Sequence, residues 1–170
     1  MTRANLKTTI ETSRPDIMGI AATAILGGAI AGALDLIYAT ARTVLWGGDA
    51  LRPWKGVAGA LLGAPAMAGG NAMVALGVAI HFLIAIGGAA AFVGSASRLP
   101  WIVRYPVLSG AAFGAALLVV MNYVILPLSM VGRPIYTGVG GLSEALLVHV
   151  VLVGLPIALV TARRARYFAS

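Results

Sequence analysis

Four long apolar runs, separated by short polar segments, make up most of this 170-residue chain. A helix needs about 20 mostly apolar residues to cross a bilayer core of about 30 Å. Each run reaches that length, so we predict an all-α fold, a four-transmembrane-helix bundle that forms a single transmembrane domain over residues 1–170. The predicted spans cover residues 17–41, 72–97, 106–128 and 142–161.

The connection between the first two spans carries a further helical pattern. Apolar residues recur there at helical spacing, at Leu51, Trp54, Ala58, Leu61 and Leu62. Such spacing is typical of a helix with one apolar face. We predict a short interfacial helix over about residues 50–62, lying at the membrane surface. A segment that re-enters the membrane is the alternative, but Arg52 and Lys55 on its polar face argue against it.

Composition supports a chain solvated by lipid. Apolar residues make up 60% of the chain and charged residues only 10%, whereas soluble domains are about 25% charged. The sequence contains no phosphate-binding glycine loop, serine nucleophile elbow or His-Glu-x-x-His motif. It also contains no cysteine, which excludes disulfides and thiolate metal sites. We therefore expect a membrane protein that is not an enzyme.

The positive charges predict an orientation. Eight of the twelve Lys and Arg residues lie in the N-terminal tail, the second connection and the C-terminal tail, and Arg42, Arg52, Lys55 and Arg133 lie on the other side. Because Lys and Arg are enriched in cytoplasmic segments, both termini are predicted to be cytoplasmic. The basic residues flank apolar runs, so we expect them to contact lipid headgroups, and we do not expect nucleic acid as a partner.

Small residues recur at helical spacing in two of the spans. Gly28 and Gly32 in the first span match Gly110 and Gly114 in the third, and each is followed by alanine. Motifs of this kind allow close packing of transmembrane helices. They favour assembly, as a homo-oligomer or within a larger membrane complex. They also suggest two tandem helical hairpins, with chance similarity as the alternative in a chain so rich in glycine.

Five polar side chains interrupt the spans, and all fall in the half of the bilayer away from the cytoplasm. They are Asp35, His81, Asn122, Glu144 and His149. With a helical rise of 1.5 Å per residue, they lie within about 13 Å of the same membrane edge. Ionisable residues inside a membrane need a partner or water. The pattern therefore predicts a polar pocket that opens to the periplasmic side and handles a small solute or a proton.

Each member of this set also has a structural interpretation. Asp35 could pair with Arg42 or with a histidine, and Asn122 could hold two helices together. His81 and His149 could instead ligate a haem iron. With Asp35 and Glu144 they could also bind a divalent metal ion. These readings leave three functions open, namely a solute- or proton-handling protein, a cofactor-binding electron-transfer protein, and a purely structural subunit.

Several short motifs occur together along the chain. They are Leu34-Asp35, His81-Phe82-x-Ile84-Ala85, Met121-Asn122-Tyr123-x3-Pro127-Leu128-Ser129 and His149-x4-Gly154-Leu155-Pro156-Ile157-Ala158. With these motifs, residues 17–162 resemble a group of small uncharacterised four-helix proteins of the bacterial inner membrane. The resemblance implies that the five polar positions belong to one recurring architecture in that membrane. It implies no reaction, substrate or cofactor.

Overall fold

Four long helices dominate the structure, a computed structural model that describes residues 17–168. They are α1 (Ile17–Leu45), α4 (Asn71–Ala96), the third span from Pro106 to Leu128, and the fourth span from Gly138 to Phe168. Each of the four is long and apolar enough to cross a membrane. The described residues therefore form an all-helical bundle, the fold class that the hydrophobic pattern predicts. The predicted N-terminal tail, residues 1–15, lies outside the described residues.

The first and last spans extend further than predicted. α1 continues to Leu45, past the predicted end at residue 41, and the fourth span begins at Gly138 instead of residue 142. The other two observed spans, Asn71–Ala96 and Pro106–Leu128, begin and end within one residue of the predicted bounds. These two extensions lie at the same end of the bundle, where Arg42 and Glu144 meet. The fourth span also continues past its predicted end at residue 161, to Phe168, at the opposite end.

Each of the last two spans contains a π-helical turn just before a proline. The third span consists of α6 (Pro106–Val120), η2 (Met121–Ile125) and α7 (Leu126–Leu128). The fourth consists of α8 (Gly138–Val148), η3 (His149–Gly154) and α9 (Leu155–Phe168). A proline ring clashes with the carbonyl four residues before it. For Pro127 and Pro156 that carbonyl belongs to Tyr123 and Leu152, and both residues lie in the widened turns. The wider turn removes the clash without breaking the span.

The small-residue motif of the first span packs within the chain. A Cβ atom on Gly28 would lie 2.5 Å from the Cα of Ile86, and one on Gly32 would lie 3.0 Å from the Phe82 ring. Both neighbours belong to α4, the next span. Glycine is needed at residue 28 because a methyl group would collide with the α4 backbone.

The motif of the third span packs in the same way on the fourth. A Cβ atom on Gly110 would lie 2.9 Å from the Gly154 carbonyl oxygen, and one on Gly114 would lie 2.3 Å from that of His149. Both glycine pairs thus contact the span that follows them, as two tandem hairpins would require. Because these motifs are used inside one chain, they no longer indicate a homo-oligomer.

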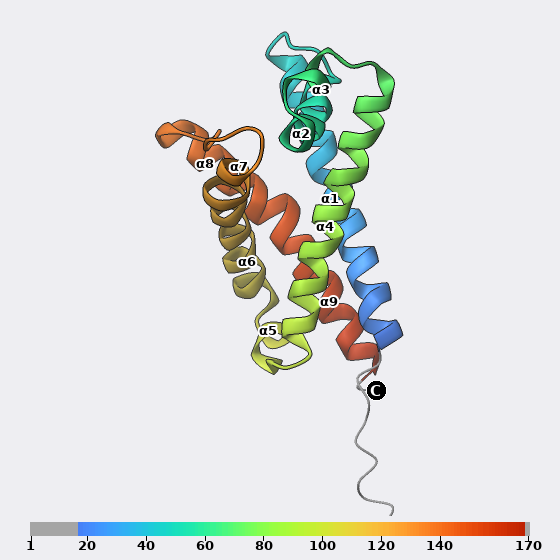
Figure 1. Ribbon diagram of the computed structural model, residues 1–170. Helices are drawn as coiled ribbons and strands as arrows, with labels where there is room; N and C mark the ends of the chain where they lie inside the picture. The colour runs from blue at the N-terminus through green and yellow to red at the C-terminus, as the bar shows by residue number, and fades with distance from the viewer. Residues whose placement is uncertain (1–16, 169–170) are drawn as a thin grey trace, which may run out of the picture.

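The two ends of the bundle differ in structure (Figure 1). One end, which we call the α2 end, holds residues 46–70 and 129–137, with α2 (Arg52–Leu62) and α3 (Ala64–Ala68). The opposite end, the α5 end, holds residues 97–105 with α5 (Pro100–Arg104), and both α1 and α9 reach it. The Ser109 hydroxyl donates to the Ile102 carbonyl oxygen at 2.7 Å, which fastens α5 to α6.

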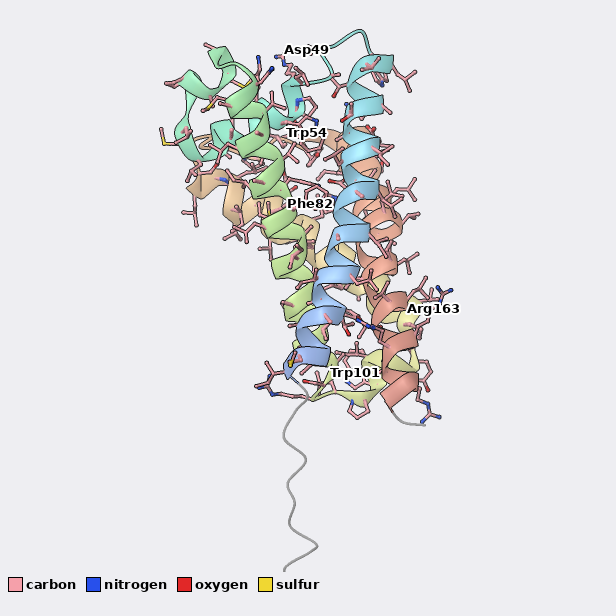
Figure 2. All side chains as sticks on the ribbon, turned by 90° about the vertical axis from the view of Figure 1, so that its right-hand side faces the viewer. Asp49, Trp54, Phe82, Trp101 and Arg163 are labelled. Carbon is pink, nitrogen blue, oxygen red and sulfur yellow. The ribbon has the colours of Figure 1, made fainter. Side chains whose placement is uncertain are left out.

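Helix α2 corresponds to the predicted interfacial helix and packs tightly on the bundle. The Trp54 side chain is 5% exposed and lies between α1 and α4 (Figure 2). Its indole N–H donates to the Thr40 hydroxyl at 3.2 Å. A Cβ atom on Gly77 of α4 would lie 1.8 Å from the Trp54 carbonyl oxygen. The apolar face of α2 is therefore divided: Trp54 and Ala58 are buried against the bundle, whereas Leu61 and Leu62 are exposed.

Candidate functional site

Helix α1 carries three polar side chains on one face near the α2 end, namely Asp35, Tyr38 and Arg42. Their spacing of three and four residues places them on one side of a helix. The partners come from two other spans: Asp35 faces His81 of α4, whereas Tyr38 and Arg42 bind Glu144 of α8. α1 is thus the helix that positions the site.

Arg42 and Tyr38 both bind the carboxylate of Glu144. The Arg42 Nη2 donates to Glu144 Oε2 at 2.9 Å, and the Arg42 Nε and the Tyr38 hydroxyl both donate to Oε1. The bonds from Arg42 form a two-pronged contact, the geometry in which arginine binds carboxylates best. Of the partners considered for Asp35, Arg42 is therefore engaged elsewhere, and the aspartate pairs with a histidine.

His81 contacts α1 through both nitrogens of its ring. Its Nε2 lies 2.9 Å from the carbonyl oxygen of Gly32. A carbonyl oxygen can only accept a hydrogen bond, so Nε2 carries the proton. The other nitrogen, Nδ1, lies 4.0 Å from Asp35 Oδ2. The imidazole is thus oriented by Gly32, and its Nδ1 faces the carboxylate.

Asp35 differs from Glu144 in how its charge is satisfied. No hydrogen-bond donor among residues 17–168 binds the Asp35 carboxylate, whereas three bonds reach Glu144. The Asp35 side chain is 26% exposed and that of His81 is 14% exposed. A carboxylate within an apolar span that lacks donors requires water, a proton or a cation. Asp35 is therefore the acidic group of this site to which the described residues donate no hydrogen bond.

Aromatic rings surround the histidine on two sides. The Trp54 ring centroid lies 5.3 Å from that of His81 and the Phe82 centroid lies 5.6 Å away, both in edge-to-face orientation. Figure 2 shows Trp54 and Phe82 in the space between α1 and α4. The sequence placed Trp54 only on the apolar face of a surface helix. Its role beside His81 depends on how α2 docks, which helical spacing does not reveal.

Tyr136 approaches the same site from the loop after the third span. Although 37% of the residue is exposed, desolvation of its hydroxyl raises the pKa of the phenol. The charge of Asp35 adds to this rise, Arg42 opposes it and Glu144 adds to it. Tyr136 therefore lies within electrostatic range of both carboxylates. No sequence pattern indicated this, because the loop has no periodicity.

Asn122 positions that loop. Its side chain is fully buried, at 0% exposure. The Oδ1 atom accepts from the backbone N–H groups of Ile135 and Tyr136 at 3.0 Å, and Nδ2 donates to the Tyr136 carbonyl oxygen at 3.0 Å. The predicted helix-to-helix contact is thus a helix-to-loop contact. Asn122 holds Tyr136 beside the site but does not line it.

His149 lies at about the height of Asp35 but makes a local bond. Two contacts align α1 with the fourth span: Gly27 packs against Ile157, and Arg42 binds Glu144. Residue numbers rise along α1 as they fall along the fourth span, so the two helices are antiparallel. Five residues after Glu144, the helical rise brings His149 down to the level of Asp35. The Nδ1 of His149 lies 2.9 Å from the Ala145 carbonyl oxygen of its own helix and donates to it.

The predicted metal ligands thus fall into separate groups. Asp35 lies beside His81, Glu144 is bound by Arg42 and Tyr38, and His149 bonds to its own helix. Within residues 17–168, no group of three or more His, Asp or Glu residues is arranged to hold a metal ion. Both carboxylate oxygens of Glu144 bind Arg42, so Glu144 does not join the other three residues as a metal ligand in this structure.

The comparisons with known proteins assign no family to this chain. No family model, curated protein or solved structure matches it. The central feature of the site is the facing pair of Asp35 and His81.

Proposed function

We propose that this chain is a bacterial inner-membrane protein, with both termini cytoplasmic, that binds a proton or a small cationic solute from the periplasmic side. It would do so without catalysing a reaction. The observation that carries the proposal is the Asp35 carboxylate, which lies within a span, accepts no hydrogen bond from residues 17–168 and faces the Nδ1 of His81 at 4.0 Å. A positive charge placed there offsets the unfavourable desolvation of the carboxylate.

The distribution of charge supports the orientation. The described part of the α5 end carries Arg98, Arg104, Arg163 and Arg164. The three acidic residues among residues 17–168, namely Asp35, Asp49 and Glu144, all lie toward the α2 end. The α2 end carries four Lys and Arg residues, whereas the other eight of the twelve in the sequence flank the opposite ends of the spans. The side with more Lys and Arg is the one expected to face the cytoplasm. The α2 end then faces the periplasm.

Uptake from one side follows from where the polar groups lie. The buried hydroxyls toward the α5 end, those of Thr23, Ser109 and Thr161, each bond to a backbone carbonyl oxygen nearby. No Asp, Glu or His among residues 17–168 lies between His81 and the α5 end. The described residues therefore offer no chain of titratable groups from the site to the cytoplasm. We propose a binding site with periplasmic access.

Infrared difference spectroscopy tests the proposal. Spectra of the protein in lipid films, recorded at two pH values, report the carboxyl groups that gain a proton. We expect a band from a poorly hydrated carboxyl group, lost in Asp35→Asn and retained in Asp49→Asn. Asp49 is the matched control because its carboxylate lies outside the spans and accepts from the Leu51 N–H. A band that survives in Asp35→Asn would show that Asp35 does not take up the proton and would remove the basis of the proposal.

A cofactor-binding function is the second candidate, and one observation favours it. Each histidine donates one ring N–H to a backbone carbonyl oxygen and leaves its other nitrogen available. Histidine ligands of metals are commonly oriented in this way. The test is the absorption spectrum of the purified protein. A haem band that disappears in both His81→Ala and His149→Ala would establish this function in place of the first, whereas a protein without such a band would retire it.

A further inference from the structure

We propose that the cation taken up by the Asp35–His81 pair carries N–H donors, as an ammonium ion or a small primary ammonium group does. This inference rests on the proposed function and narrows its substrate class. It follows from the kind of atoms that face one another, their separation, the charge at the site and the space around it.

The first step concerns the two atoms that face the ligand. His81 Nε2 donates to the Gly32 carbonyl oxygen, so in the neutral imidazole the facing Nδ1 is the nitrogen with the lone pair. Asp35 Oδ2, at 4.0 Å, is likewise an acceptor when the carboxylate is ionised. Two acceptors do not bond to each other, so this pair calls for a donor placed between them.

The second step is the separation. A single atom that donates two hydrogen bonds of about 2.9 Å, at a tetrahedral angle, joins acceptors that are about 4.7 Å apart. The 4.0 Å between Nδ1 and Oδ2 is shorter, so the two side chains must move apart by about 0.7 Å when a donor enters between them. Both side chains are partly exposed, at 26% and 14%, so a group the size of a water molecule can approach each of them.

The third step is the charge. Glu144 is neutralised by Arg42, whereas no Lys or Arg among the described residues pairs with Asp35. Water could bridge the pair but would bring no charge. A metal cation would bring charge without donors, and hard cations require several oxygen ligands. The Gly32 carbonyl oxygen is already used by His81, and the described residues provide no group of three ligands. An ammonium group supplies both the charge and the donors.

The last step is size. The rings of Trp54 and Phe82 pack against the imidazole at centroid distances of 5.3 and 5.6 Å. Trp54 is itself held by Thr40 and by the backbone of α4 at Gly77. These contacts occupy two sides of the imidazole, which favours a small ligand over a bulky one beside His81.

The contact between Trp54 and His81 provides the reporter for the test. The protein contains three tryptophans, and the substitutions Trp46→Phe and Trp101→Phe leave Trp54 as the only one. The fluorescence of this variant is titrated in lipid nanodiscs with ammonium, methylammonium, tetramethylammonium and potassium chlorides at constant pH and ionic strength. We expect a saturable change with ammonium and methylammonium, which carry N–H donors. Potassium and tetramethylammonium lack such donors and should produce none.

Variants show whether the response arises at the pair. Asp35→Asn should weaken ammonium binding by about tenfold or more, because a hydrogen bond to a charged group is lost. His81→Phe keeps an aromatic ring but removes the Nδ1 acceptor, and it should also weaken binding. Asp49→Asn, the matched control, should bind as the parent does. Circular dichroism and an unchanged Trp54 emission maximum without ligand establish that each variant is folded.

The alternative outcomes are distinguishable. An equal response to potassium would overturn the requirement for donors, and a response that persists in Asp35→Asn would place the ligand elsewhere. If the Asp35 carboxyl band responds to pH but ammonium does not bind, this inference fails and the proposed function stands. If neither the infrared band nor the Trp54 fluorescence responds, the proposed function fails as well.

Discussion

Arg42 binds Glu144 of another span, although Asp35 lies only two turns away on its own helix. Two hydrogen bonds from the guanidinium reach the Glu144 carboxylate, and Tyr38 adds a third. The contact joins α1 to α8 at the α2 end of the bundle. The two acidic residues therefore differ in role. The Glu144 carboxylate joins two helices, whereas the Asp35 carboxylate accepts no hydrogen bond from residues 17–168.

The pair of Arg42 and Glu144 should contribute modestly to stability. Their side chains are 46% and 39% exposed, so solvent screens the interaction. We expect Glu144→Gln to lower the free energy of unfolding by no more than about 1 kcal/mol, with a smaller effect at high salt. Thermal unfolding in detergent of Glu144→Gln, Arg42→Gln and the double variant measures the coupling. Strictly additive effects would mean that the contact stabilises nothing.

Asn122 should contribute strongly to the free energy of unfolding, because its side chain bonds to three backbone groups. Asn122→Ala leaves three backbone groups of Ile135 and Tyr136 without their partner. We expect a loss of about 2–3 kcal/mol in the free energy of unfolding, together with faster proteolysis of the loop at residues 129–137. Asn71→Ala is the control, because Asn71 is exposed at the start of α4. Equal stabilities of the two variants would contradict the role assigned to Asn122.

Gly77 and Gly87 of α4 offer a matched pair of substitutions. A methyl group at residue 77 would meet the Trp54 carbonyl oxygen at 1.8 Å, whereas at residue 87 it would meet nothing within 4 Å. Gly77→Ala should displace α2, red-shift the emission of Trp54 and lower stability by about 1–3 kcal/mol. Gly87→Ala should be neutral or stabilising by about 0.5–1 kcal/mol. An unshifted Trp54 emission in Gly77→Ala would show that α2 does not dock through this contact.

The absence of cysteine makes the orientation simple to test. In intact cells, a membrane-impermeant thiol reagent should label Asp49→Cys, at the α2 end, and should not label Ser97→Cys, at the α5 end. Both parent residues are exposed. A reporter fused after Ser170 should read as cytoplasmic. Labelling of Ser97→Cys from outside the cell would reverse the proposed orientation.

Hydropathy predicted the number of spans but not how far two of them extend. The predicted first span stopped at Ala41 because Arg42 is charged, yet the guanidinium finds Glu144 and the helix continues to Leu45. The predicted fourth span excluded Gly138 to Gly141 because glycine disfavours helices. The apolar run behind these glycines nevertheless propagates the helix to Gly138. In both cases a tertiary contact or a neighbouring segment outweighed the local preference.

The depth of the polar residues was accessible from the sequence, and their pairing was not. Helical rise predicted that Asp35 and His81 lie in the same half of the bilayer, and the structure brings them together. It also predicted Asn122 in the same pocket, whereas the amide turns toward a loop. Pairing depends on the rotation of each span about its axis. Close packing at Gly28 and Gly114 sets that rotation, and a periodic pattern does not specify it.

The π turns before Pro127 and Pro156 change the direction in which the side chains on either side of each turn point around the helix axis. Each widened turn takes in an additional residue, and one residue corresponds to about 100° of rotation around an α-helix. Deleting one residue within His149–Gly154 would let that turn close into a regular α-helix. Glu144 would then rotate by about a quarter of a turn relative to the packed Ile157, away from Arg42. The direction in which the side chains of α8 point at the α2 end therefore depends on a turn that lies deeper in the same span.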